Sequence, residues 1–253
     1  MWRGFSFWLL QYRRVWRGTI VISVANPLLF LLGVGVGIGH LVDRQASSPI
    51  AGVSYLAFFA PGMLAAASMQ TAYLESTNRV AWAAAPDGAY RAATPTPLSP
   101  AQILGGHLLF IAFRIATSSA AFTLVMVLFG ATHGWSALAT LGGAVLTGFA
   151  FAAPSAAWAV GLRQTRRINS VFRFVIMPMY LFSGTFFAIA QLPHWLRPVA
   201  YLLPLYHGAQ LCRTLSLGTA TAAATALHAG ILLALALAGI AAARVAYRRR
   251  LHP

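Results

Sequence analysis

The side chains that could carry proton chemistry in this sequence are few and widely spaced. They are the acidic residues and the histidines that stand near the ends of apolar segments or among prolines, namely Asp43, Glu75, Asp87, His40, His107, His207 and His228. A proton relay would have to use Glu75 and these histidines, and their scatter favours polar residues at an interface instead. We find no serine, histidine and acid grouping, no paired carboxylates and no histidine metal-ligand spacing. We therefore expect no catalytic residues and no metal site.

Nucleotide chemistry on this chain is also poorly supported. The phosphate-binding loop of P-loop ATPases needs a lysine on the β- and γ-phosphates, and all 18 basic residues here are arginine. The stretch GVGVGIG, Gly33 to Gly39, resembles a nucleotide-binding glycine loop, but no strand precedes it. Gly33 and Gly37 stand four residues apart, which favours close helix packing or, as the alternative, a smooth conduit wall. If ATP drives this protein, another chain hydrolyses it.

The elements that position these residues must lie in a membrane. With 59% hydrophobic and 8% charged residues, the 253-residue chain has too little polar surface to cover a soluble globule of its size. Six apolar segments, each near the roughly 20 residues that a bilayer requires, occur at 19–41, 53–74, 103–129, 137–160, 172–190 and 220–243. The outer connections are short and no internal repeat is visible. We expect one all-α domain of six transmembrane helices over residues 19–253.

The arginines predict the orientation of this domain. Cytoplasmic termini place the arginines of the N-terminal segment, the inner loops and the C-terminal tail inside, and leave Arg44, Arg197 and Arg213 outside. A net charge of +15 in a membrane protein is typical of cytoplasmic flanks and contacts with anionic lipids, not of nucleic-acid binding.

Arg114 is the one arginine that falls within a span. An uncompensated arginine at a helix centre costs about 2.5–3.5 kcal/mol on insertion scales. Its side chain must therefore either snorkel to the inner headgroups or meet a polar partner inside the bundle, and snorkelling is the favoured interpretation.

Residues 1–18 have an amphipathic pattern at about 100° per residue. Apolar and aromatic residues, among them Trp2 and Trp16, share one side, while Arg13, Arg14 and Arg17 gather on another. The pattern predicts an interfacial amphipathic helix. A plain basic flank before the first span is the alternative.

The longest predicted inner connection is residues 76–102. Its prolines forbid one continuous helix, and a helical turn or two fits between them at 83–93. A short helix held in this way is suited to contact a partner protein, although a plain structured loop fits the composition equally well. The candidate contact residues are Arg79, Tyr90, Arg91, Pro97, Leu98 and Ser99.

The stretch LPHWLRPVAYLLPLYH, at 192–207, is apolar but broken by three prolines. Such chain is tolerated at membrane depth where protein or a water-filled cavity covers its backbone. We expect a re-entrant helical hairpin over 191–215, on the outer side between the fifth and sixth spans, that forms either the outer gate of a conduit or a lid over the spans. The gate residues would be Trp195, Arg197, Tyr201, Pro204, Tyr206, His207 and Arg213.

Together these features resemble the permease subunits of ABC type-2 exporters, in the branch that includes nodulation-factor (lipo-oligosaccharide) exporters and daunorubicin-resistance permeases. The resemblance covers nearly the whole chain. Its most specific parts are ATPTPLSPAQILGGHLL, at 93–109, and YLFSGTFFAIAQLPHWLRPVAYLLPLYHGAQLCRTLSLG, at 180–218. The second part includes the paired Phe186 and Phe187, expected in the conduit or its packing, and departs from many relatives at Ala188, where they have a proline.

The resemblance implies a multi-pass permease of the bacterial cell membrane that contacts membrane lipids, a second permease, either a copy or a paralogue, and two cytoplasmic ATPase subunits that hold ATP and Mg. The N-terminal helix and the inner-loop helix would rest on the ATPases, and the substrate would pass between the permeases. We expect export of a lipid-linked glycan, a lipid-like molecule or an amphipathic substrate. A drug-efflux permease of the same family is the alternative, and a proton-driven carrier or a membrane enzyme is less supported.

Overall fold

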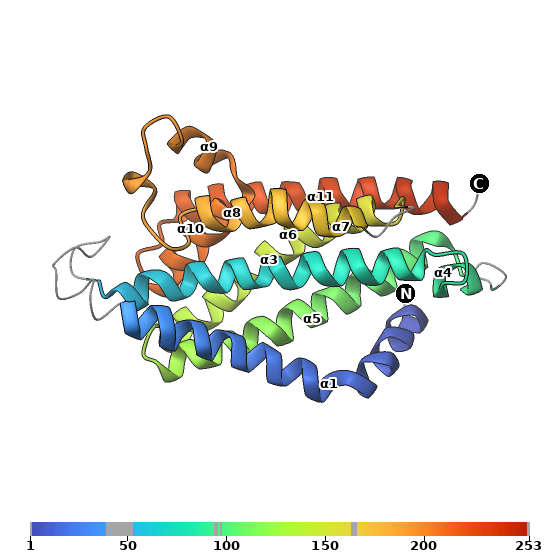
Figure 1. Ribbon diagram of the computed structural model, residues 1–253, viewed down its shortest axis with the longest axis horizontal. Helices are drawn as coiled ribbons and strands as arrows, with labels where there is room; N and C mark the ends of the chain where they lie inside the picture. The colour runs from blue at the N-terminus through green and yellow to red at the C-terminus, as the bar shows by residue number, and fades with distance from the viewer. Residues whose placement is uncertain (1, 39–52, 94–95, 97, 163–165, 252–253) are drawn as a thin grey trace.

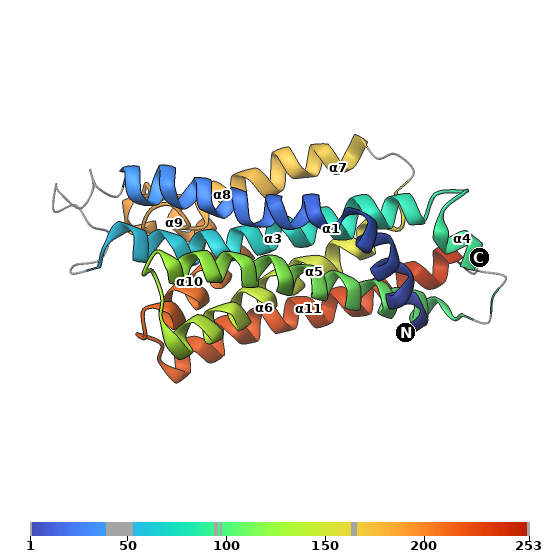
Figure 2. The ribbon, with the colours of Figure 1, turned by 90° about the horizontal axis from the view of Figure 1, so that it is seen from below.

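The computed structural model describes residues 2–38, 53–93, 96, 98–162 and 166–251, and the regular structure in these residues is entirely helical. In Figures 1 and 2 the long helices lie side by side along the longest axis, with both chain ends and the short α4 at the same end. We call this the inner end and the opposite end the outer end, following the predicted orientation. The elements in chain order are α1 (Trp2–Phe30), η1 (Leu31–Ile38), α3 (Tyr55–Ala83), α4 (Ala89–Ala93), α5 (Pro100–Leu128), α6 (Gly134–Ala159), α7 (Arg166–Val171), η2 (Phe172–Ile176), α8 (Met177–Phe182), η3 (Ile189–Gln191), α9 (Arg197–Leu202), α10 (Pro204–Ser216) and α11 (Ala222–Leu251).

Three of these helices, α5, α6 and α11, are long and apolar enough to cross a membrane by length and composition. They coincide with the third, fourth and sixth predicted segments, although α11 continues through the tail arginines to Leu251. Helix α3 matches the start of the second segment but continues to Ala83, so the first part of the predicted inner loop is helical. The inner loop is therefore shorter than the expected 76–102.

Helix α1 is continuous from Trp2 to Phe30, where two helices were expected over 1–18 and 19–41. It is bent, so its N-terminal part leaves the axis of the remainder (Figures 1 and 2). The apolar side of this part is buried against α5: the rings of Phe5 and Tyr12 both lie edge-on to Phe113, with centroids 6.2 Å away. The amphipathic pattern thus directs aromatic side chains onto the helical bundle.

The helical structure of the inner loop is interrupted, as its prolines predict. Helix α4 is a single turn, and α5 begins at Pro100 behind an N-cap at Ser99. The Ser99 hydroxyl accepts from the Gln102 amide at 3.3 Å, and the Gln102 side chain accepts from the Ser99 amide at 3.0 Å. This reciprocal cap satisfies two of the free amide groups at a helix start, and it separates α4 firmly from α5.

The fifth predicted segment, 172–190, needs correction. Helical structure begins earlier, at Arg166, passes through a π-helical turn and ends at Phe182. Gly184 then takes a φ of 76°, which side chains with a Cβ rarely adopt, and the Ser183 and Thr185 hydroxyls bond each other at 2.9 Å. Residues 183–188, including Phe186 and Phe187, are thus irregular chain at the outer end and not part of a span.

The core lies around α3 and α6, which pack against each other and against α5 and α10. Helix α6 also packs closely on α11, where a Cβ on Gly239 would lie 2.4 Å from Pro154 Cδ. Helix α10 returns into the bundle and packs against α3, α6 and α11, whereas α9 stands away from the long helices in Figure 1. The segment expected as a hairpin at 191–215 therefore has two unequal helices, of which only α10 enters the core.

Candidate functional site

A buried cluster at the inner end joins α4 to three other helices. The Tyr90 side chain of α4 is only 2% exposed. Its hydroxyl contacts Nδ1 of His107 on α5 and lies 3.0 Å from the Tyr247 hydroxyl on α11. The Trp8 ring of α1 stacks on His107 at 4.2 Å with an interplanar angle of 15°. We call Trp8, Tyr90, His107 and Tyr247 the inner anchor.

The electrostatics of the inner anchor favour a single hydrogen-bond chain. Burial, with a further contribution from Tyr247, raises the pKa of the Tyr90 hydroxyl well above 10, so this group keeps its proton. A neutral tyrosine has one proton to donate. Both contacts are satisfied when Tyr247 donates to the Tyr90 oxygen and Tyr90 donates to His107 Nδ1. Helix α4 is thereby held in one orientation relative to α5 and α11.

A second buried network lies next to the inner anchor and corrects the expectation for Arg114. This side chain is 4% exposed. It donates from Nε to Glu75 Oε1 at 3.1 Å and from Nη1 to the Tyr12 hydroxyl at 2.9 Å, and its guanidinium lies 4.6 Å from the Tyr12 ring centre. Glu75 also pairs with Arg79. Arg114 therefore does not snorkel, because a carboxylate from α3 and a hydroxyl from α1 satisfy it inside the bundle.

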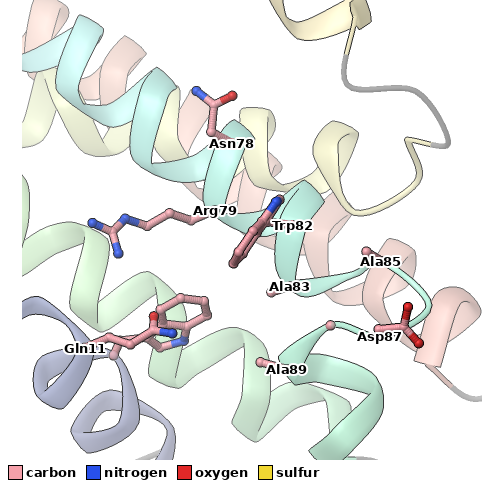
Figure 3. Close-up of a pocket in the computed structure, with 10 residues that line it drawn as sticks. Gln11, Asn78, Arg79, Trp82, Ala83, Ala85, Asp87 and Ala89 are labelled. Atoms are coloured by element: carbon pink, nitrogen blue, oxygen red, sulfur yellow. The ribbon is translucent and has the colours of Figure 1, made fainter.

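A cleft of about 710 Å³ opens beside these two networks (Figure 3). Trp8 and Gln11 of α1 line it opposite Asn78, Arg79 and Trp82 of α3. The remaining lining comes from the turn into α4, namely Ala83, Ala85, Asp87, Gly88 and Ala89. Figure 3 shows the Trp82 ring standing over the cleft, with Gln11 on its far side and Asp87 at its end.

The structure places the other expected contact residues of the inner end around α4 and α1. Leu98 is half-buried against the core, while Ser99, Arg13 and Arg14 are exposed. Trp2 and Trp16 are exposed as well, in contrast to Trp8 on the same helix. Pro97 lies outside the described residues, and so do the side chains of Arg17 and Arg91.

At the outer end Arg213 of α10 is buried, with 3% exposure. It donates to the Phe58 carbonyl of α3 at 3.1 Å and to the Gly184 carbonyl at 2.8 Å, and its guanidinium stacks 3.8 Å from the Phe58 ring centre. A Cβ on Gly62 would lie 2.9 Å from Arg213 Nη2. Arg213 thus joins α10, α3 and the irregular chain at 183–188.

Of the remaining expected gate residues, some are exposed on the surface and others lie between α10 and α11. Trp195 and Tyr201 are exposed, and Arg197 caps its own segment by donating to the Leu192 carbonyl at 3.0 Å. Pro204 is the first residue of α10. Tyr206 and His207 are half-buried, and His207 Nδ1 lies 2.9 Å from Nδ1 of His228 on α11.

The expected conduit residues lie on two different segments, η1 and the irregular chain at 183–188. Gly33 and Gly37 are exposed on η1, and a Cβ on Gly33 would have no neighbour within 4 Å. Among the described residues, therefore, none packs closely against Gly33. Phe186 is half-buried, with its ring 5.6 Å from Phe59 and its carbonyl accepting from the Tyr55 hydroxyl at 3.1 Å. Phe187 packs against the small apolar cluster under α9.

Comparison with known proteins identifies the family. A sequence model described as ABC-2 type transporter matches residues 2–217. The chain belongs to the ABC-2 type transporter family. This permease is 30% identical to Nodulation protein J of Rhizobium leguminosarum bv. viciae, over 96% of this chain and 95% of that protein. It is 30% identical to Nodulation protein J of Rhizobium meliloti, over 100% and 95%, and 29% identical to that of Bradyrhizobium diazoefficiens, over 96% and 90%. No solved structure matches it significantly.

The resemblance inferred from the sequence motifs is thereby confirmed. The chain is a membrane-embedded permease component of an ABC exporter, and it works with an ABC ATPase subunit. It is a transport subunit and not a catalytic enzyme. The matched residues include both the inner anchor residues up to His107 and the whole of α10.

Sequence reasoning missed three members of the inner anchor in this permease. Trp8 was visible only as one of several aromatic residues on the apolar side of α1. His107 was interpreted as a polar residue at a span end, and Tyr247 lies among the tail arginines. Two tyrosines, a tryptophan and a histidine in four different elements have no common spacing, so only the folded chain brings them together.

Proposed function

We propose that this permease converts movement of α4, driven by the partner ATPase, into movement of its transmembrane helices. The inner anchor is the observation that carries this proposal. Tyr90 of α4 bonds to His107 of α5 and to Tyr247 of α11, and Trp8 of α1 packs on His107. Because of these contacts, α4 cannot move without moving the helices that it contacts. Packed and hydrogen-bonded networks of this kind can carry coupling between distant sites. In this role Tyr90 is an internal anchor, and exposed side chains near α4 that lie outside the cleft, such as Ser99, contact the ATPase.

The complete exporter in this proposal contains two permeases and two ATPase subunits in the bacterial cell membrane, with both permease termini in the cytoplasm. The segment formed by η2 and α8 supports a second permease, since its exposed face is largely apolar. Its exposed large apolar residues are Phe174, Val175, Met177, Leu181 and Phe182. Exposed apolar faces of this kind are covered by lipid or by another membrane helix.

The exported molecule in this proposal is a lipid-linked glycan or a related amphipathic molecule. Relatives of 29–30% identity are named for nodulation, and the sequence motifs resemble lipo-oligosaccharide exporters, which supports a glycolipid over a drug. The outer gate would be α9 with the outer end of α10. Arg213 fixes α10 to α3 and to residues 183–188, so a shift of α3 would be transmitted to this gate.

Reconstitution with and without the ATPase tests the proposal. Permease and ATPase are placed together in lipid vesicles, and transport of an acylated oligosaccharide is measured with ATP, without ATP, and with an imposed proton gradient. We expect transport only with ATP and ATPase, and weaker transport of a cationic amphipathic dye. Transport by the permease alone under a proton gradient would establish the carrier instead, and dye transport that exceeds glycolipid transport would establish the drug-efflux permease.

A further inference from the structure

The cleft at the inner end contains polar and aromatic groups that the coupling function does not use. Trp82 is 79% exposed although it lines the cleft. Within the described part of the chain, the side chains of Gln11, Asn78 and Asp87 have no hydrogen-bond or ion-pair partner. In Figure 3 Gln11 and Trp82 lie on either side of the space between α1 and α3, Asn78 stands further along α3, and Asp87 lies on the turn before α4.

The exposed positions on α3 are arranged as a stripe that leaves this cleft. Most of α3 is buried, but Leu74, Asn78 and Trp82 are exposed. They are four residues apart, so they share one face of the helix. The stripe covers the last turns of α3, from Trp82 at the cleft back to Leu74.

We propose that this cleft binds the sugar portion of the exported molecule before translocation. The inference rests on the proposed glycolipid export. A tryptophan ring offers a broad apolar face together with a polar edge, which suits the C–H face of a sugar ring. The Gln11 and Asn78 amides can each donate and accept hydrogen bonds, and the Asp87 carboxylate accepts them, so all three groups can bond to sugar hydroxyls. The volume falls within the range of about 300–1,000 Å³ for small-molecule sites.

The charges around the cleft favour a neutral sugar over a phosphate. The lining cation, Arg79, is already paired with Glu75, and its guanidinium lies 5.4 Å from the Phe110 ring centre. The lining anion, Asp87, has no such partner among the described residues. Glu75 is shared between Arg79 and Arg114, so these three groups carry one net positive charge, which the Asp87 carboxylate offsets. A phosphate would therefore meet no excess positive charge in the cleft, whereas a neutral sugar needs none.

The same cleft is in contact with the inner anchor. Trp8 forms one wall of the cleft and stacks on His107, which in turn contacts Tyr90. A bound sugar would press on the face of the network that holds α4. Sugar binding in the cleft can therefore affect the position of α4, the helix that the ATPase moves, through Trp8, His107 and Tyr90 alone.

Direct binding to the purified full-length permease in lipid nanodiscs tests the site. The probes are a neutral hexose oligomer, an N-acetylhexosamine oligomer, a uronic acid oligomer and inorganic pyrophosphate, each followed by calorimetry. We expect one of the neutral oligomers to bind most tightly. Trp82→Ala should raise its dissociation constant about tenfold through loss of the aromatic contact, and Asn78→Ala should raise it by a smaller factor. The matched control is Trp135→Ala, which removes an 84% exposed tryptophan at the other end of the bundle and should leave binding unchanged.

Three results would overturn the inference. The first is tighter binding of pyrophosphate than of the neutral oligomers. The second is sugar binding that Trp82→Ala and Asn78→Ala leave unchanged. The third is a Trp82→Ala permease that binds sugar normally but no longer associates with the ATPase, because the cleft would then be an ATPase contact surface. ATP-driven transport measured in vesicles separates this inference from the exporter proposal. Active transport with no sugar bound at the cleft refutes only the site, whereas sugar binding without ATP-driven transport refutes only the exporter.

Discussion

Replacing Tyr90 by phenylalanine tests the inner anchor with the smallest possible change. The ring and its packing stay, while the hydroxyl that contacts His107 and Tyr247 is lost. Each buried polar group left without its partner costs about 1–3 kcal/mol. For a chain of this size, each kcal/mol lowers the melting temperature by about 2–4 °C. Tyr90→Ala should cost more, about 3–5 kcal/mol as for other large aromatic truncations, because it also opens a cavity.

Two measurements are needed, because the anchor has a structural and a coupling role. Thermal unfolding of the purified permease gives the first, and substrate exported per ATP hydrolysed in the vesicle complex gives the second. We expect Tyr90→Phe to lower both, with ATPase association retained. Thr219→Val is the control, since it removes an exposed hydroxyl in the turn between α10 and α11, outside the anchor and the proposed gate. A double-mutant cycle with Tyr247→Phe should show a coupling energy of about 0.5–3 kcal/mol.

The outcome that refutes this reasoning is a Tyr90→Phe permease with the melting temperature and the export per ATP of the unmodified chain. The hydroxyl would then be irrelevant to the position of α4. A loss of stability alone, with export per ATP unchanged, would leave Tyr90 as a structural residue and remove it from the coupling proposal.

Two further changes test the buried charges and the close contacts. Glu75→Gln should destabilise the permease by about 3–5 kcal/mol, measured by thermal unfolding, since it leaves Arg114 buried without its carboxylate. Recovery of stability on adding Arg114→Gln would confirm the ion pair. Unchanged stability in the single variant would contradict it. Gly62→Ala should cost about 1–3 kcal/mol, because its Cβ would lie 2.9 Å from Arg213 Nη2. Gly142→Ala is its control, with no neighbour within 4 Å, and equal melting temperatures of the two glycine variants would contradict the tight packing.

The two ends of α3 are held in related ways. At the inner end Glu75, which also pairs with Arg79 of the same helix, connects α3 to Arg114 of α5, and at the outer end the Phe58 carbonyl accepts a hydrogen bond from Arg213 of α10. Each contact uses a charge that would be costly in lipid if left alone. Helix α3 therefore links the two ends of the bundle through buried polar contacts, in keeping with a helix that transmits movement from the inner anchor to the outer gate.

Much of the helical framework was predictable because it depends on local pattern. Apolar runs of sufficient length predict α5, α6 and α11, and the prolines predict the break before α5. The fifth segment was misplaced because apolar composition continues through 183–190, while Gly184 ends the regular structure. Hydrophobicity alone does not record where a helix stops. The cytoplasmic location of the termini stays a prediction from the arginine distribution.

By itself the sequence determined that this is a membrane-embedded, helical ABC-2 permease with no nucleotide-binding lysine, because composition, spacing and motif are properties of neighbouring residues. Only the tertiary structure decided what the isolated polar residues do. Arg114 meets Glu75 across two helices, and Tyr90 meets His107 and Tyr247 across three. These partners are 39, 17 and 157 residues apart in the chain. No local pattern encodes such distances, so the choice between snorkelling and pairing, and between contact surface and buried anchor, is made only when the helices pack.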